Sequence, residues 1–175
     1  MKYAYTGGVL LGGSEEMEPR AGLVVKTEGE QIAAIEPEGG DLAGYEVIDL
    51  AGRYLMPGLI NMHVHLPANG KPKKKQQDNA KMVKLMTSNA LMKSVLRKMC
   101  EGYARTQLMS GVTTIRTMGG VLNCDSAIRD RIDAGEIVGP RILAANTAVS
   151  VPGGHMAGSL AYEAHSAGEA RDYVA

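Results

Sequence analysis

Two histidines separated by one residue, His63 and His65, have the clearest capacity for chemistry in this sequence. They end an apolar run that begins at Leu59 and is typical of a buried β-strand. Side chains alternate along a strand, so residues two apart lie on the same face and both imidazoles can reach one cation. Imidazole nitrogens bind zinc at about 2.0–2.1 Å. The spacing therefore suits a metal site with His63 and His65 as ligands, with a chance pair of core histidines as the alternative.

Two later residues are candidates for substrate binding. Arg116 ends a strand-like segment, where it could bind a carboxylate or support the site, although a surface arginine fits the pattern equally well. His155 lies in a glycine-rich loop and could contact substrate or be an exposed loop histidine. The sequence favours neither alternative. His165 falls in a predicted helix and is interpreted as a surface residue.

The chain has two regions with different sequence patterns, and the candidate residues lie in the second. Residues 1–57 contain strand candidates at 22–26, 31–35 and 46–50, with a hairpin turn at 27–30, which predicts a small β-sandwich or meander. Residues 58–175 alternate between strands and helices; the strands are expected at 59–66, 112–118 and 141–145, and the helices at about 80–109, 124–134 and 163–175. This alternation predicts βαβ units and a parallel sheet, an α/β fold.

Two remaining features receive structural interpretations. The polar loop at 67–79 carries Lys71, Lys73, Lys74 and Lys75, which we expect to be a solvated cluster. Cys100 and Cys124 lack metal-type spacing and are expected to be reduced thiols, with a disulfide between them as the alternative.

The run GRYLMPGLINMHVHL from Gly52 to Leu66 closely resembles the first-strand signature of the amidohydrolase superfamily. The segment GVTTIR at 111–116 resembles the second-strand signature of that family. GPRIL at 139–143 and Gly-Gly-His at 153–155 resemble the third strand and its loop in the subgroup of imidazolonepropionase-like enzymes and metal-dependent prolidases and carboxypeptidases. Relatives often have Arg-Asp where this chain has Arg116-Thr117.

The resemblance implies a fold. Residues 1–57 would form part of a small β-sandwich, and residues 58–175 the first three or so β/α units of a (β/α)8 TIM barrel. A complete barrel typically needs about 250 residues, so this chain is not expected to close one by itself. The remainder of the barrel is then an expected partner, supplied by a longer polypeptide or by a second one.

The resemblance also implies hydrolysis of an amide, lactam or peptide C–N bond by a hydroxide bound to one or two divalent metal ions, with zinc as the expected ion. His63 and His65 would bind the more buried ion. The family's other ligands and its general base, an Asp after the eighth strand, have no counterpart in these residues. No catalytic residue is therefore assigned in this chain, and the 175 residues alone are expected to be inactive.

Composition limits the partners. The formal net charge is zero, which argues against a nucleic-acid or membrane-surface role. No segment has the apolar length of a membrane span, and the first residues lack the pattern of a secretory signal, so a cytoplasmic location is expected. The expected substrate is an amino-acid-derived amide or dipeptide, and a homo-oligomer is expected. The alternative function is a non-catalytic binding or assembly fragment that retains the signature.

Overall fold

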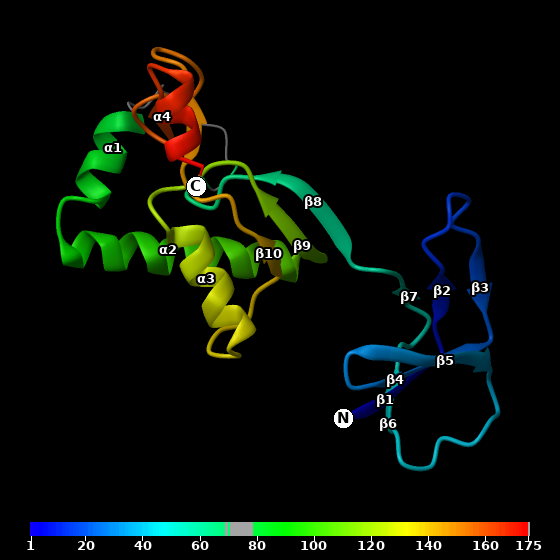
Figure 1. Cartoon of the computed structure of the whole chain (residues 1–175). Coiled ribbons are helices and arrows are strands. Elements are labelled where there is room, and N and C mark those ends of the chain that lie inside the picture. The colour runs from blue at the N-terminus through cyan, green and yellow to red at the C-terminus, as the bar shows by residue number, and fades with distance from the viewer. Residues whose placement is uncertain (69, 71–78, 175) are drawn as a thin grey trace. The chain divides into compact units, whose positions relative to one another are not determined.

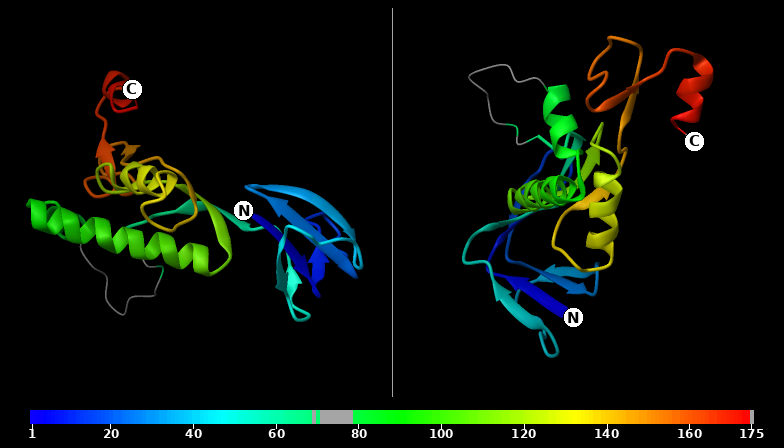
Figure 2. Two further views of the ribbon diagram at one scale, coloured as in Figure 1. Left: turned by 90° about the horizontal axis from the view of Figure 1, so that it is seen from below. Right: turned by 90° about the vertical axis from the view of Figure 1, so that its left-hand side faces the viewer.

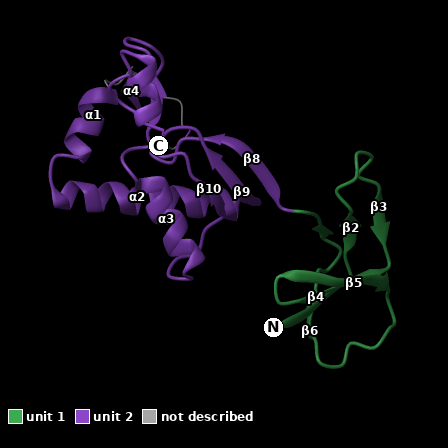
Figure 3. Cartoon of the chain, viewed as in Figure 1, with its two compact units in different colours: residues 1–57 green, residues 58–175 purple. Residues whose placement is uncertain are grey.

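The computed structural model describes residues 1–68, 70 and 79–174 (Figure 1). Two compact units divide the chain, Met1–Pro57 and Gly58–Ala175 (Figure 3). The lysine-rich segment predicted to be a solvated loop, with Lys71, Lys73, Lys74 and Lys75, lies outside the described residues.

The first unit consists of two small sheets. One has the strand order β5-β4-β1-β6, with β1 at Lys2–Thr6, β4 at Leu23–Glu28, β5 at Gln31–Pro37 and β6 at Glu46–Asp49. The other has the order β3-β2-β7, with β2 at Val9–Leu11, β3 at Pro19–Ala21 and β7 at Tyr54–Leu55. The hairpin expected from the sequence is confirmed, since β4 and β5 are antiparallel and Gly29 adopts a φ of 61° between them.

The second unit is an α/β structure built on a parallel sheet. Its strand order is β10-β9-β8, with β8 at Leu59–Val64, β9 at Val112–Thr117 and β10 at Arg141–Leu143. The helices are α1 at Asn79–Met86, α2 at Ala90–Met109, α3 at Cys124–Asp133 and α4 at Ala167–Asp172. A second parallel pair consists of β11 at Ala148–Ser150 and β12 at Ala161–Glu163. The predicted alternation of strands and helices from β8 to β10 is confirmed.

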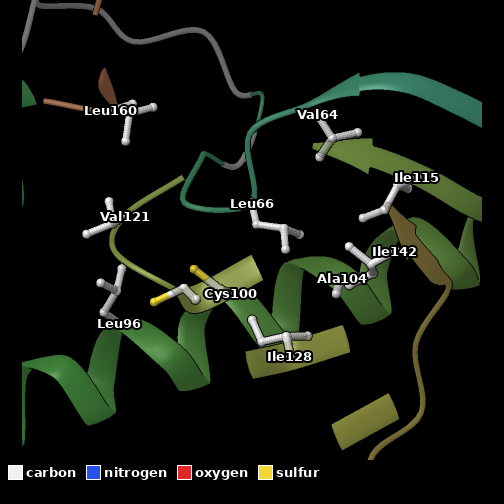
Figure 4. Close-up of a cluster of buried hydrophobic side chains, with 11 residues drawn as sticks. Val64, Leu66, Leu96, Cys100, Ala104, Ile115, Val121, Ile128, Ile142 and Leu160 are labelled. Atoms are coloured by element: carbon white, nitrogen blue, oxygen red, sulfur yellow. The ribbon is translucent and has the colours of Figure 1, made fainter. Parts of the chain in front are cut away.

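The hydrophobic core of this unit lies between the sheet and two helices. Helices α2 and α3 pack side by side on one face of the sheet (Figures 1 and 2). Each strand and each helix contributes buried side chains, namely Val64, Ile115, Ile142, Leu96, Cys100, Ala104 and Ile128 (Figure 4). Leu96, Cys100 and Ala104 recur at four-residue steps, which places them on one face of α2. This packing fixes the carboxyl ends of β8 and β9 relative to each other.

The structure corrects three sequence-based boundaries. The helix expected at 80–109 is two helices, because Asn89 adopts an extended conformation and its side-chain oxygen accepts a hydrogen bond of 3.0 Å from the Met92 N–H. The glycine-rich segment after β10 was expected to be a loop but contains β11. The helix expected from residue 163 begins only at Ala167, after β12 and the Ser166 cap.

Cys100 and Cys124 are free thiols, as expected, and both are buried where α2 meets α3. Their thiol groups interact through a hydrogen bond that raises the pKa of Cys100 and lowers that of Cys124. None of the helices in the described residues has the length and apolar character that a bilayer-spanning segment needs.

Candidate metal centre

The carboxyl end of β8 brings the two predicted ligands together. His63 lies near the end of the strand and His65 follows directly after it. The pairing of β8 with β9 is irregular between Asn61 and Val64. At this irregularity the Asn61 side-chain oxygen accepts a hydrogen bond of 3.2 Å from the His63 backbone N–H. Asn61 thus stabilises the local backbone that carries His63.

The two imidazoles converge on one point. Their Nε2 atoms lie 3.3 Å apart, and the ring planes are inclined by 68°. Two nitrogens bound to one tetrahedral zinc ion at about 2.0–2.1 Å would be separated by about 3.3–3.4 Å. The spacing of the His63 and His65 nitrogens therefore fits two ligands of a single divalent cation.

A backbone carbonyl fixes the proton on His65. The Nδ1 atom of His65 lies 2.9 Å from the carbonyl oxygen of Gly119, which can only accept a hydrogen bond. Nδ1 is therefore the donor, which leaves the lone pair of the ring on Nε2, the atom that faces His63. Metal-binding histidines commonly donate their second nitrogen to a carbonyl or carboxylate in this way. The tautomer of His65 matches the one that a metal ligand needs.

The described residues supply only part of a coordination sphere. They contain no group of three or more His, Cys, Asp or Glu side chains placed to hold a metal ion. The His pair instead opens onto a pocket of about 320 Å³, also lined by Tyr103, Thr106 and Gln107 of α2. Two imidazoles need further donors to hold zinc tightly, because structural and catalytic zinc sites use three or four protein ligands.

Neither candidate substrate-binding residue lines this pocket in the described part of the chain. Arg116 is exposed, and its Nε donates a hydrogen bond of 3.0 Å to the Met62 carbonyl, which ties β9 to β8 beside His63. His155 is exposed in the turn between β11 and β12. His165 is exposed as expected, and its backbone N–H donates to Glu169 at the start of α4.

Sequence reasoning missed an acidic residue behind the site. Asp125 is fully buried in the first turn of α3, and neither of its carboxylate oxygens has a hydrogen-bond partner among the described residues. Burial raises the pKa of the Asp125 carboxyl. The Thr117 side chain and the Asn146 backbone, which lie near the carboxylate, oppose this effect and lower the pKa. An Asp at the start of a helix is common, so its local sequence gave no signal of this burial.

The part of the chain that carries this site matches a known protein family. Residues 54–174 match the amidohydrolase family. The chain belongs to the amidohydrolase family. The matched segment includes both histidines at the carboxyl end of β8, the sheet and helices of the second unit, and Asp125.

Two solved enzymes have a structure similar to that of this chain, and a deaminase is similar in sequence over a short segment. A candidate prolidase from Bifidobacterium longum is 30% identical with a TM-score of 0.72, over 98% of this chain and 37% of that protein. A Xaa-Pro dipeptidase solved with methionine in its active site is 25% identical with a TM-score of 0.68, over 89% of this chain and 36% of that enzyme. An adenine deaminase of Klebsiella pneumoniae is 48% identical over 44 residues, which are 25% of this chain and 7% of the deaminase. The chain thus spans little more than a third of these solved relatives.

Proposed function

We propose that this chain supplies the first two metal ligands, His63 and His65, of an enzyme that hydrolyses a C–N bond in an amide or peptide. The convergence of the two Nε2 atoms at 3.3 Å, with the His65 tautomer held by Gly119, carries the proposal. A divalent cation bound there, zinc as the expected ion, would polarise a carbonyl and lower the pKa of water.

The residues of this chain have distinct roles in the proposed centre. His63 and His65 bind the cation, Asn61 stabilises the backbone of His63, and Gly119 orients His65. Arg116 and His155 remain candidates for contacts with the substrate. No described residue is assigned as general base, because the family's general base follows a later strand.

The family signature in the sequence and the arrangement of the parallel sheet both support a barrel. The parallel sheet β10-β9-β8 with helices on one face is the arrangement expected for the start of a (β/α)8 barrel, whose active site lies at the carboxyl ends of the strands. We propose that residues 58–175 form this part of the barrel and residues 1–57 part of a small β-sandwich. The rest of the barrel is then the partner that completes the metal site.

Among substrates, we propose an amino-acid-derived amide or a dipeptide. A candidate prolidase and a Xaa-Pro dipeptidase, 30% and 25% identical to this chain, support this class. Another similar structure, 28% identical, is a phenylurea hydrolase, which widens the set of C–N bonds to test.

Metal content and hydrolysis test the proposal together. The complete gene product and its His63→Ala, His65→Ala and His165→Ala variants would be loaded with Zn²⁺ and assayed on Xaa-Pro dipeptides, N-acyl amino acids and a phenylurea. We expect His63→Ala and His65→Ala to lose zinc and activity, whereas His165→Ala, an exposed histidine of the same unit, keeps both. Equal zinc content in all variants would refute the metal site. Zinc binding without hydrolysis of any C–N substrate would favour the alternative of a non-catalytic binding or assembly protein.

A further inference from the structure

Asp125 is a buried carboxylate without a hydrogen-bond partner among the residues that the structure describes. Its exposed fraction is 0%. A buried carboxylate without partners is destabilising, because it loses hydration and gains no hydrogen bond in return. Such a group in a native structure calls for a compensating interaction.

The carboxylate packs against the glycine turn that orients His65. A Cβ atom on Gly120 would lie 2.6 and 2.7 Å from the two Asp125 oxygens, so the carboxylate fills the space that the missing side chain leaves. Gly119, the preceding residue, gives its carbonyl oxygen to His65 Nδ1. The Gly119–Gly120 turn therefore contacts the imidazole of His65 through one glycine and the Asp125 carboxylate through the next.

Asn146 holds the turn in place. Its carbonyl oxygen accepts a hydrogen bond of 2.6 Å from the Gly120 N–H, and its side-chain oxygen accepts one of 3.1 Å from the Ser126 N–H. Asn146 thereby connects the turn to the first turn of α3, which also carries Asp125. These contacts hold the glycine turn beside the first turn of α3.

We propose that Asp125 is a positioning residue for the metal centre, whose buried negative charge stabilises the cation held by His63 and His65 across the Gly119–Gly120 turn. The inference rests on the proposed function. In the interior a charge is weakly screened, so a carboxylate behind a ligand can strengthen cation binding without coordinating it. The same burial that destabilises the metal-free chain then favours the metal-bound one.

Removal of the Asp125 charge should weaken metal binding and stabilise the metal-free chain. These two effects together separate a positioning role from a structural one. Asp125→Asn keeps the shape of the side chain and removes the charge. We expect it to weaken Zn²⁺ binding about tenfold, the lower end of the range for residues behind metal ligands. We also expect it to raise the melting temperature of the metal-free chain. A purely structural residue would lower the melting temperature when changed.

The experiment is a Zn²⁺ titration of the complete gene product against a chromophoric chelator, with thermal unfolding of each protein in a chelator of divalent metals. Asp133→Asn is the matched control, because it removes the same charge from the exposed end of the same helix. Nitrogen-15 NMR of the His65 ring then tests whether Nδ1 still carries the proton in Asp125→Asn. Asp125→Ser serves as a second neutral variant if the asparagine variant does not fold.

The possible outcomes test the inference about Asp125 separately from the proposed function. Tenfold weaker binding with a higher melting temperature in Asp125→Asn, and neither change in Asp133→Asn, supports the inference. If His63→Ala abolishes Zn²⁺ binding but Asp125→Asn binds Zn²⁺ as tightly as the wild type, the inference is overturned and the proposed function is kept. Weaker binding with a lower melting temperature and a changed His65 tautomer shows a structural role and also overturns it. Zinc binding that does not depend on His63 overturns the proposed function, and the inference with it.

Discussion

Gly119 is the residue on which the orientation of His65 most directly depends. Its φ of 136° lies in a region that favours glycine, and a Cβ atom there would lie 3.5 Å from His65 Nδ1. A side chain at this position would strain the backbone whose carbonyl orients the imidazole, and its Cβ atom would be in ordinary van der Waals contact with that ring.

We therefore expect Gly119→Ala to lower stability by about 1–2 kcal/mol and to weaken Zn²⁺ binding roughly tenfold. Gly111→Ala is the matched control, because Gly111 has a φ of 89° and no atom within 4 Å of its Cβ position. It should lower stability similarly and leave Zn²⁺ binding unchanged. Urea unfolding and Zn²⁺ titration measure the two effects. Equal loss of zinc affinity in both variants would contradict the role given to Gly119.

The pH dependence of stability reports on Asp125. Because burial raises its pKa in the folded chain, the folded state takes up the proton at a higher pH than the unfolded state does. The free energy of unfolding should therefore rise as the pH falls through this raised pKa. Below the ordinary aspartate pKa of about 3.9 both states are protonated, and the contribution becomes constant.

Asp125→Asn removes this titration. We expect the metal-free variant to be more stable than the wild-type chain at pH 7, and the difference to shrink as the pH is lowered towards 4. Urea unfolding between pH 4 and 8, with a chelator present, measures it. A difference that grows at low pH would show that Asp125 is stabilised as a carboxylate in the folded chain.

Among the elements, helix α2 depends on its N-terminal cap. Asn89 ends the irregular segment after α1, and its side chain caps the first turn of α2. This cap sets where α2 starts and hence where Leu96, Cys100 and Ala104 meet the sheet. The helix also lines the pocket beside the His pair through Tyr103.

Asn89→Ala should lower stability by about 1 kcal/mol, because an N–H of the first turn loses its partner. Ser94→Ala, a substitution at an exposed interior position of the same helix, should be neutral or slightly stabilising. Urea unfolding of the two variants gives the comparison. Similar stability in both would mean that solvent satisfies the N–H that Asn89 binds.

At the scale of the whole molecule, metal binding should stabilise one unit selectively. His63, His65, Gly119 and Asp125 all belong to Gly58–Ala175. A ligand that binds only the folded state stabilises it by about 2.7 kcal/mol at a free concentration 100 times its Kd. This stabilisation should appear where the ligands are, in the parallel sheet and its helices.

Hydrogen exchange followed by mass spectrometry tests this expectation. Zn²⁺ should slow exchange in peptides from β8, β9 and α3 and leave peptides of Met1–Pro57 unchanged. The His65→Ala variant should show no slowing in either unit. Slowing confined to the first unit would place the metal elsewhere in the chain.

Local pattern was sufficient for several elements. Apolar and β-branched runs predicted β8 and β9, and the turn at Gly29 predicted the β4–β5 hairpin, because these signals depend on neighbours in the sequence. Local pattern failed where a single contact decides the structure. The Asn89 cap divides a continuous apolar stripe into two helices, and the short strands β11 and β12 owe their form to pairing with each other.

The sequence by itself determined which two histidines could share a cation, since alternation along one strand requires no distant contact. Only the tertiary structure decided the distance between their nitrogens and the tautomer of His65, which depends on a carbonyl 54 residues away. It also decided that Asp125 is buried against Gly120, the residue that follows this carbonyl. Such features arise when β8, β9 and α3 pack together, because burial and hydrogen bonding between distant segments exist only in the folded chain.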